Sequence, residues 1–206
     1  LITVTDMEYN LFIIAIIIYL VGSIPFAFIL TKFSGYGDIR NIGSGNVGTT
    51  NVLRTGNKFL AITVLIFDIL KGYLPTFYIL NYLFDSNNNE LIIYVLGSIA
   101  ILGHLFPFWL KFKGGKGIAT YIGFIFAVNF VLGAFFVFLW LFIAFLIKYS
   151  SMASIISLFA IPFLMLFLSY KPSIFLFFSL LSIILIIKHQ ANIKRLLNNT
   201  EPKIKF

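Results

Sequence analysis

Long apolar segments alternate with short polar segments along this chain. Runs with few or no charged residues cover positions 11–31, 59–83, 91–110, 117–147, 149–170 and 172–187. Because the apolar core of a bilayer, about 30 Å thick, takes about 20 helical residues, these runs predict membrane-spanning helices. Inside run 117–147, Asn129 lies between Gly123 and Gly133, which predicts a short helix, a tight turn and a second helix. We therefore predict an all-α integral membrane protein with about seven transmembrane helices, some of them short, or five if the short ones are re-entrant.

The composition supports a lipid environment. Hydrophobic residues make up 60% of the 206 residues, charged residues make up 11%, and the mean hydropathy is +1.02. A soluble domain carries about 25% charged residues, so this balance argues against a disordered chain, a coiled coil and a soluble nucleic-acid binder. Cysteine is absent, which excludes disulfides and thiolate metal sites.

The charged residues predict the orientation. With the N-terminus outside and seven spans, the C-terminus is cytoplasmic and 13 of the 15 Lys and Arg residues lie on the inner side. Only Lys171 falls outside, and Lys71 falls within a span. The acidic residues expected on the outer side are Asp6, Glu8, Asp85 and Glu90. Because cytoplasmic loops collect Lys and Arg in membrane proteins, this bias also explains the net charge of +8.

The chain is expected to form one domain. Residues 1–6 precede Met7 and are interpreted as an added leader, and residues 7–206 as a single polytopic membrane domain. The first helix lacks a basic segment and a small-residue cleavage site, which argues against a signal peptide.

Three polar islands fall on the predicted inner side, and the first is the loop of residues 34–58. Its centre reads G-S-G-N-V-G-T-T-N-V-L-R, residues 43–54. Glycines let backbone N–H groups turn toward one point and bind an anion, and Arg54 can place two donors on a phosphate. A solvated connecting loop is the alternative. The candidate residues of this island are Gly43, Ser44, Gly45, Asn46, Gly48, Asn51 and Arg54.

The second island, residues 103–120, contains G-G-K-G just before a predicted helix. A helix N-terminus that follows a glycine turn and a lysine is a ready anion site. The Walker A spacing is missing, so nucleotide hydrolysis is not implied. A basic patch on anionic lipid is the alternative; it suits Lys111 and Lys113 but leaves the glycines unexplained. The candidates are His104, Gly114, Gly115, Lys116, Gly117 and Thr120, and a structural role is the alternative for His104.

The third island, residues 188–205, follows the last predicted helix. His189 and Asn192 are three residues apart and are expected on one face at the cytoplasmic end of that helix. Glu201 is the one acidic residue of this basic tail. An interfacial amphipathic tail is the alternative for its Lys and Arg residues.

Two charged residues, Asp68 and Lys71, lie within one predicted span and are three apart, so they can pair. A charged residue inside a span suggests a function. The alternative is a structural ion pair that locks the packing of helices.

The islands combine cations with hydroxyl and amide donors, which suits substrates with one or two phosphates. No cluster of Asp and Glu is present, which argues against a two-metal site and against the CDP-alcohol phosphotransferases. The H-x-x-x-x-D box of acyl-CoA-dependent glycerolipid acyltransferases is missing, since Trp109 stands five residues after His104 and Lys194 five after His189. A Ser-His-Asp set cannot be placed.

Three segments resemble the cytoplasmic motifs of the bacterial acyl-phosphate:glycerol-3-phosphate acyltransferases, the PlsY family. They are residues 43–54, the segment G-H-L-F-P-F-W-L-K-F-K-G-G-K-G-I-A-T and the segment H-Q-A-N-I-K-R-L-L-N-N-T-E-P-K-I. The opening L-V-G-S-I-P-F-A and the D-I-L-K-G around Asp68 match as well. This chain has V-G-T where the family usually has P-G-A, at residues 47–49. It has Asn199 near a common glycine, and Asn tolerates the left-handed conformation.

The resemblance implies the reaction and its residues. An acyl group moves from acyl phosphate to the 1-hydroxyl of glycerol-3-phosphate, giving lysophosphatidic acid and phosphate without metal or other cofactor. It also implies a monomer in the bacterial inner membrane, with the active site on the cytoplasmic side and no nucleic-acid partner. By position, the catalytic residues fall on Ser44, Arg54, Lys116, His189 and Asn192. The phosphate-cradling loop falls on Gly114, Gly115 and Gly117.

Two other classes of protein compete with this interpretation. A small transporter for an organic phosphate would also use a basic cytoplasmic vestibule, but such proteins often show internal pseudo-symmetry, which is not seen here. A non-enzymatic membrane scaffold would not need glycine-rich anion loops.

Overall fold

The computed structural model describes residues 4–83 and 90–204, and these ranges are helices joined by loops and turns. Residues 1–3 of the predicted leader, the predicted outer residue Asp85 and Lys205 lie outside the described residues. The main helices are α1 (Val4–Gly22), α2 (Phe26–Phe33), α3 (Thr49–Val52), α4 (Lys58–Tyr78), α5 (Glu90–Leu105), α6 (Ile118–Val128), α7 (Phe130–Ile147), α8 (Ser150–Phe167), α9 (Pro172–Ile187) and α10 (Gln190–Leu197). The predicted all-α membrane fold is thereby confirmed.

The chain divides into two compact units, Leu1–Val128 and Asn129–Phe206. Five helical segments of the described chain are long and apolar enough to cross a membrane, or six if the bent pair α9 and α10 counts as one span. Helix α6 is apolar but has only 11 residues, about half the length that a full span needs. The predicted number of seven spans, and the orientation of the chain, therefore stay predictions.

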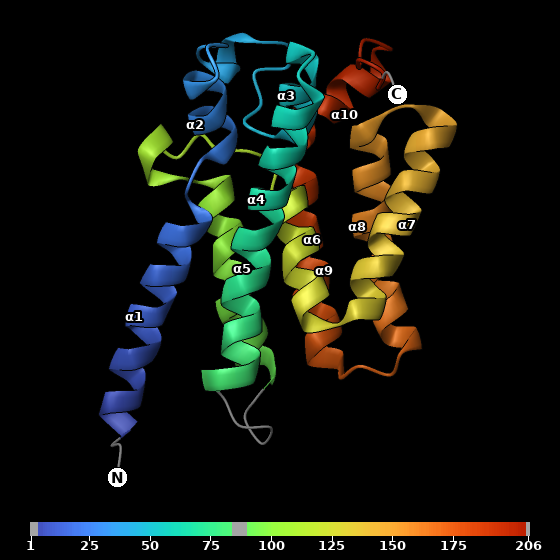
Figure 1. Cartoon of the computed structure of the whole chain (residues 1–206). Coiled ribbons are helices and arrows are strands. Elements are labelled where there is room, and N and C mark those ends of the chain that lie inside the picture. The colour runs from blue at the N-terminus through green and yellow to red at the C-terminus, as the bar shows by residue number, and fades with distance from the viewer. Residues whose placement is uncertain (1–3, 84–89, 205–206) are drawn as a thin grey trace. The chain divides into compact units, whose positions relative to one another are not determined.

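In the first unit, glycines let the long helices approach closely. Helix α4 packs against α5 and α6, and α1 packs against α5 (Figure 1). Gly72 of α4 faces the backbone of Thr120 on α6, and Gly123 of α6 faces the backbone of Ile69 on α4, with no room for a Cβ at either glycine. Such small residues are typical of helix contacts in lipid, where close van der Waals packing drives association.

The first predicted span, 11–31, is confirmed as a candidate span over Leu11–Phe33, but it is not one continuous helix. Helix α1 ends at Gly22 and α2 begins at Phe26, with a break at residues 23–25. Pro25 has no N–H to continue the helical ladder, and its ring disfavours helical geometry in the residue before it. The break is also fixed from outside, because Trp109 Nε1 donates to Ser23 Oγ at 2.9 Å.

In the second unit, α7 packs against α8 and α8 against α9. The predicted turn near Asn129 is confirmed: α6 ends at Val128, and the Asn129 side chain caps α7 by accepting from the Val131 N–H at 2.8 Å. Trp140 Nε1 on α7 donates to Ser154 Oγ on α8 at 2.9 Å. The C-terminal segment contacts the end of α7, because the Ile204 N–H donates to the Lys148 carbonyl at 2.7 Å.

The last predicted helix does not continue into the third island. Helix α9 ends at Ile187, and α10 follows at an angle of 61° to it. The expected tolerance for a left-handed residue near the end of the chain is confirmed at Asn199, whose φ is 55°. The bend and this turn bring the tail of the chain back to the start of α8, where Glu201 contacts Ser151.

Candidate active site

Asn51 organises the first polar loop. The residue is 1% exposed, and its Nδ2 donates to the carbonyls of Ile39 at 3.0 Å and Ile42 at 2.8 Å. Its Oδ1 accepts from the Ser44 backbone N–H at 2.9 Å and lies 3.3 Å from Ser44 Oγ. Both amide hydrogens are therefore used inside the loop. Asn51 therefore fixes the shape of the loop and holds Ser44 at the surface of the loop.

The glycines around Ser44 follow from this geometry. Gly43 and Gly45 have φ values of 54° and 69°, in the left-handed region that glycine adopts at little cost. A Cβ on Gly43 would collide with Asn51 Oδ1 and with the Arg54 side chain. Arg54 thus lies along the Gly43 backbone with an exposed side chain, and no ion pair holds it within residues 4–83 and 90–204.

The remaining glycine and amide candidates of this loop lie beside these residues. A Cβ on Gly45 would approach the Arg40 carbonyl to 3.1 Å, and one on Gly48 would approach Asn46 Nδ2 to 3.1 Å. Gly48 has extended backbone and precedes the short helix α3. All seven candidates of the first island therefore belong to one folded loop rather than to an open connection.

The second loop is closed at its base by two backbone hydrogen bonds. The Gly115 N–H donates to the His104 carbonyl at 3.1 Å, and the Gly114 N–H donates to the Leu105 carbonyl at 3.3 Å. Lys116 follows at once, and Gly117, with φ 80°, leads into α6. The prediction that G-G-K-G immediately precedes a helix is confirmed. Thr120 lies fully buried in the first turn of α6, where its carbonyl faces Gly72, and so away from the loop surface.

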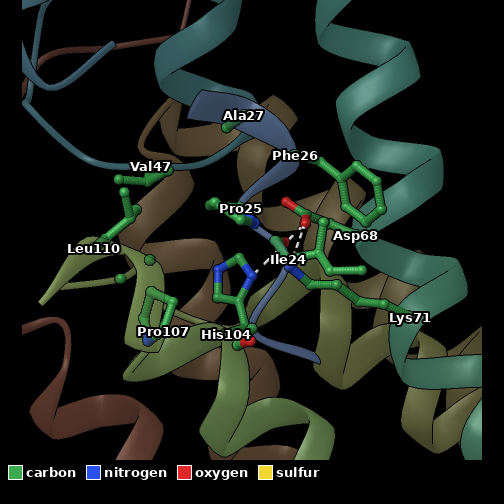
Figure 2. A pocket seen from close by; sticks show the side chains of 13 residues that line it. Ile24, Pro25, Phe26, Ala27, Val47, Asp68, Lys71, His104, Pro107 and Leu110 are labelled. Atoms are coloured by element: carbon green, nitrogen blue, oxygen red, sulfur yellow. Dashed lines mark hydrogen bonds and ion pairs between the residues drawn. The ribbon is translucent and has the colours of Figure 1, made fainter. Parts of the chain in front are cut away.

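The first and second islands meet at Gly115. A Cβ on this glycine would collide with the His104 ring on one side and with the Val47 carbonyl on the other. Val47, His104 and Gly115 also line a small pocket beside the break between α1 and α2 (Figure 2). Tertiary packing in the first unit therefore places Lys116 next to a loop from the first island.

Asp68 and Lys71 form the predicted pair. Lys71 Nζ lies 2.7 Å from Asp68 Oδ1 and donates to the Ile24 carbonyl at 2.9 Å. His104 Nδ1 lies 3.7 Å from the same carboxylate oxygen, and Figure 2 shows the side chains of His104, Asp68 and Lys71 pointing toward one another. The ion pair therefore links α4 to the α1–α2 break and to the ring that supports Gly115, which favours the structural alternative.

The third island lies in the second unit. His189 is the residue before α10, and the Asn192 N–H donates to the His189 carbonyl at 2.8 Å. The two residues thus share the first turn of α10, not the end of α9 as predicted. His189 Nδ1 lies 2.8 Å from the Leu185 carbonyl oxygen, which can only accept. Nδ1 therefore carries hydrogen, and in the neutral imidazole Nε2 is the unprotonated nitrogen.

Glu201 contacts the candidate residue Asn192, although Glu201 itself was not among the candidates predicted from the sequence. Its carboxylate accepts from Ser151 Oγ at 2.6 Å, from Asn192 Nδ2 at 2.7 Å and from Arg195 Nε at 2.7 Å. Burial alone would raise the pKa of Glu201, but these three donors outweigh burial and hold the pKa below its ordinary value. A single acidic residue in a basic tail was the available signal, but the sequence does not reveal its partners.

Comparisons with known proteins show the family of this chain. The chain matches the family described as glycerol-3-phosphate acyltransferase over residues 12–199. A glycerol-3-phosphate acyltransferase of Pelagibacter ubique is 44% identical, with 97% of this chain and 100% of that protein covered. Another, from Mesorhizobium japonicum, is 46% identical, with 96% and 98% covered.

Two crystal structures of PlsY, an integral membrane glycerol 3-phosphate acyltransferase, share the fold. The glycerol 3-phosphate form has a TM-score of 0.87 at 34% identity, and the lysophosphatidic acid form has 0.84 at 32%. Each comparison covers 95% of this chain and 96% of the other. The fold and these comparisons together define a membrane acyltransferase. The chain belongs to the glycerol-3-phosphate acyltransferase family typified by PlsY, as the sequence motifs indicated.

Proposed function

We propose that this protein transfers an acyl group from acyl phosphate to the 1-hydroxyl of glycerol-3-phosphate, releasing phosphate and forming lysophosphatidic acid. Membership of the family over residues 12–199 is the observation that carries this proposal. The relatives are named for the acceptor, and the two similar PlsY structures are described as its glycerol 3-phosphate and lysophosphatidic acid forms. The acyl-phosphate donor rests on the motif resemblance.

The reaction asks for binding and orientation more than for strong acid–base chemistry. The hydroxyl oxygen attacks the acyl carbon, a new C–O ester bond forms, the bond from the acyl carbon to the phosphate oxygen breaks, and phosphate leaves. Acyl phosphate is a mixed anhydride with a good leaving group, so holding the two reactants together can supply up to about 7–11 kcal/mol of the barrier. Both substrates are anions, so cations must offset their repulsion.

In the first unit, Arg54 and Lys116 are the cations to which we assign the phosphates. The exposed guanidinium of Arg54 next to Gly43 supports this role, since a planar fork suits phosphate oxygens. Lys116 lies at the N-terminal end of α6, where the helix dipole also favours an anion. Ser44, presented by Asn51, is assigned to orient glycerol-3-phosphate.

The other loop residues take supporting roles in this proposal. Gly114, Gly115 and Gly117 give the second loop its close turn, and Gly43, Gly45 and Gly48 do the same for the first. Asn46 and Asn51 shape the first loop. His104 packs against Gly115, and Thr120 lies in the contact between α6 and α4.

In the second unit, His189 and Asn192 are assigned to the glycerol part of the acceptor. The hydroxyl proton has two candidate acceptors, His189 Nε2 and an oxygen of a substrate phosphate. The contact of His189 Nδ1 with the Leu185 carbonyl supports the first candidate, because it leaves Nε2 as the unprotonated nitrogen of a neutral ring.

The setting we propose is a monomer in the bacterial inner membrane, with the loops on the cytoplasmic side and no metal or other cofactor. The described residues contain no group of three or more His, Asp or Glu side chains that could hold a metal ion. The excess of Lys and Arg on the predicted inner side supports the orientation.

The test is acyl transfer by purified protein in detergent with EDTA present. Labelled glycerol-3-phosphate is offered with palmitoyl phosphate and, separately, with palmitoyl-CoA. We expect lysophosphatidic acid and phosphate from the acyl phosphate alone. Product from palmitoyl-CoA would refute the donor, and loss of activity that Mg²⁺ restores would refute the metal-free reaction. Folded protein without product from either donor would favour transport of glycerol-3-phosphate.

A further inference from the structure

The buried carboxylate of Glu201 is held in a single orientation by its hydrogen-bond donors. The side chain is 5% exposed, Oε2 accepts from Arg195 Nε at 2.7 Å, and Oε1 accepts from Ser151 Oγ at 2.6 Å. An ionised carboxylate has acceptors only, so whatever contacts it must donate. The network therefore requires a donor at the point where Asn192 approaches.

Asn192 meets that requirement with its amide nitrogen. Nδ2 donates to Glu201 Oε1 at 2.7 Å, and the opposite assignment would set two acceptor oxygens against each other. The carboxylate thus decides which way round the amide stands, and Oδ1 points away from Glu201. Asn192 is 4% exposed, and within the described part of the chain its Oδ1 has no hydrogen-bond partner.

An unpaired buried acceptor is costly unless a donor arrives from outside the chain. We propose that Glu201 is a positioning residue: it holds the Asn192 amide so that Oδ1 accepts a hydrogen bond from a hydroxyl group of glycerol-3-phosphate. This inference rests on the proposed function, which supplies the ligand. It adds the atom that recognises the acceptor, the direction of the hydrogen bond and the residue that enforces that direction.

The arrangement also selects among ligands. An acceptor at this point favours a ligand that brings an O–H group and disfavours one that brings only a carbonyl or ether oxygen there. A ligand without an O–H group at this point is rejected more strongly than by a site whose amide can rotate by half a turn, because the Glu201 carboxylate prevents that rotation of Asn192.

The first variant is Glu201→Gln. Arg195 Nε still requires an acceptor, so the Gln carbonyl takes the place of Oε2 and its NH2 group faces Asn192. Asn192 must then flip and present its NH2 group to the ligand. We expect the KM for glycerol-3-phosphate to rise about tenfold, the loss expected for one hydrogen bond to a buried group. We expect kcat and the KM for acyl phosphate to stay within about twofold, because the bond forms in ground and transition states alike.

Ser151→Ala is the matched control. It removes a second donor to the same Oε1 but leaves the carboxylate facing Asn192, so the KM for glycerol-3-phosphate should stay within about twofold of wild type. A merely structural role of Glu201 would produce a different pattern in Glu201→Gln: fewer active molecules, hence a lower apparent kcat with an unchanged KM for glycerol-3-phosphate. That pattern would overturn the inference.

An exchange of the two groups keeps the test decisive if Glu201→Gln folds poorly. Asn192→Asp alone sets two carboxylates against each other and should impair glycerol-3-phosphate binding strongly. In the double variant Asn192→Asp with Glu201→Gln, the NH2 group of the new amide at position 201 donates to one oxygen of the new carboxylate at position 192. The other oxygen of that carboxylate is left to accept from the ligand hydroxyl. We expect this double variant to recover a KM within about threefold of wild type.

The outcomes separate the two proposals. Wild-type turnover with a double variant no better than Asn192→Asp would overturn the positioning role and leave the proposed function standing. Wild-type protein that is folded but makes no lysophosphatidic acid would overturn the proposed function, and this inference with it. Turnover with the KM pattern above supports both.

Discussion

Lys71 Nζ lies 2.7 Å from Asp68 Oδ1, with both side chains at most 4% exposed. The pair is three residues apart on α4, and the lysine also reaches the Ile24 carbonyl at the break between α1 and α2. The ion pair on α4 therefore helps to hold the break between α1 and α2 in place.

Removing one member of this pair should destabilise the protein more than removing both. Lys71→Met leaves the buried Asp68 carboxylate with only the His104 ring beside it, at a cost of up to about 3–5 kcal/mol, whereas Asp68→Leu with Lys71→Met removes both charges of the pair. For a chain of this size we expect a drop in melting temperature of the order of 10 °C for the single variant and a few degrees for the double. Thermal unfolding in detergent measures both. A stable double variant without acyl transfer would show that the pair has a direct functional role.

Gly115→Ala should damage the site without unfolding the protein. The new Cβ would meet both the His104 ring and the Val47 carbonyl, so the loop that carries Lys116 must shift. A displacement of this kind, of about 1 Å, can cost about 100-fold in rate. Steady-state kinetics measure the effect.

Gly35→Ala is the control for this prediction. Gly35 has φ +82° and no neighbour within 4 Å of a Cβ, so the substitution strains the backbone locally without moving the second loop. Activity should stay within about threefold of wild type. Equal loss in both variants would mean that the protein responds to any added Cβ in its polar loops.

Asn51→Ala should loosen the whole first loop. It removes the hydrogen bonds to Ile39, Ile42 and Ser44, each worth about 0.5–1.5 kcal/mol, and leaves the Ser44 backbone N–H without its acceptor. We expect faster hydrogen exchange over residues 39–56 and loss of most acyl transfer. Ser44→Ala should reduce transfer without changing exchange, since the backbone N–H to Asn51 remains. Unchanged exchange in Asn51→Ala would contradict the role given to its amide.

Arg54→Ala and Lys116→Ala should each lower transfer at least about 100-fold while the protein remains folded, because each removes a cation assigned to a phosphate. Lys113→Ala is the matched control: it removes an exposed charge three residues before Lys116 and should keep near wild-type turnover. Purified variants are compared in the same assay, with size-exclusion profiles as the check on folding. Near wild-type turnover of Arg54→Ala or Lys116→Ala would refute the assignment.

The pH dependence of stability should reveal Glu201. Its pKa in the folded protein lies below the ordinary value of 4.5, so folding favours the ionised form. The stabilisation is then fully present above about pH 4.5 and is lost as the pH falls through the folded pKa. Wild type should be more stable than Glu201→Gln at neutral pH, and the difference in melting temperature should shrink below about pH 4.5. A difference that stays constant down to about pH 3 would contradict this.

The sequence determined the features that depend on neighbouring residues. Apolar runs of sufficient length predicted the helices, and Asn129 predicted the break between α6 and α7, because an Asn side chain can cap the helix that follows it. The tolerance of Asn199 for a left-handed turn was likewise local. The order and length of the polar motifs were specific enough to identify the family.

Tertiary structure alone decided which of these residues act on one another. Asn51 turning inward to hold Ser44, Gly115 set between His104 and Val47, and Glu201 fixing the Asn192 amide are all contacts between segments apart in the sequence. The break of the first helix at residues 23–25 is similar, because Pro25 weakens the helix there but Trp109 and Lys71 hold the bend. Hydrophobic periodicity reports which residues are buried; it carries no information on which buried donor finds which buried acceptor, because that pairing is set by how the helices pack.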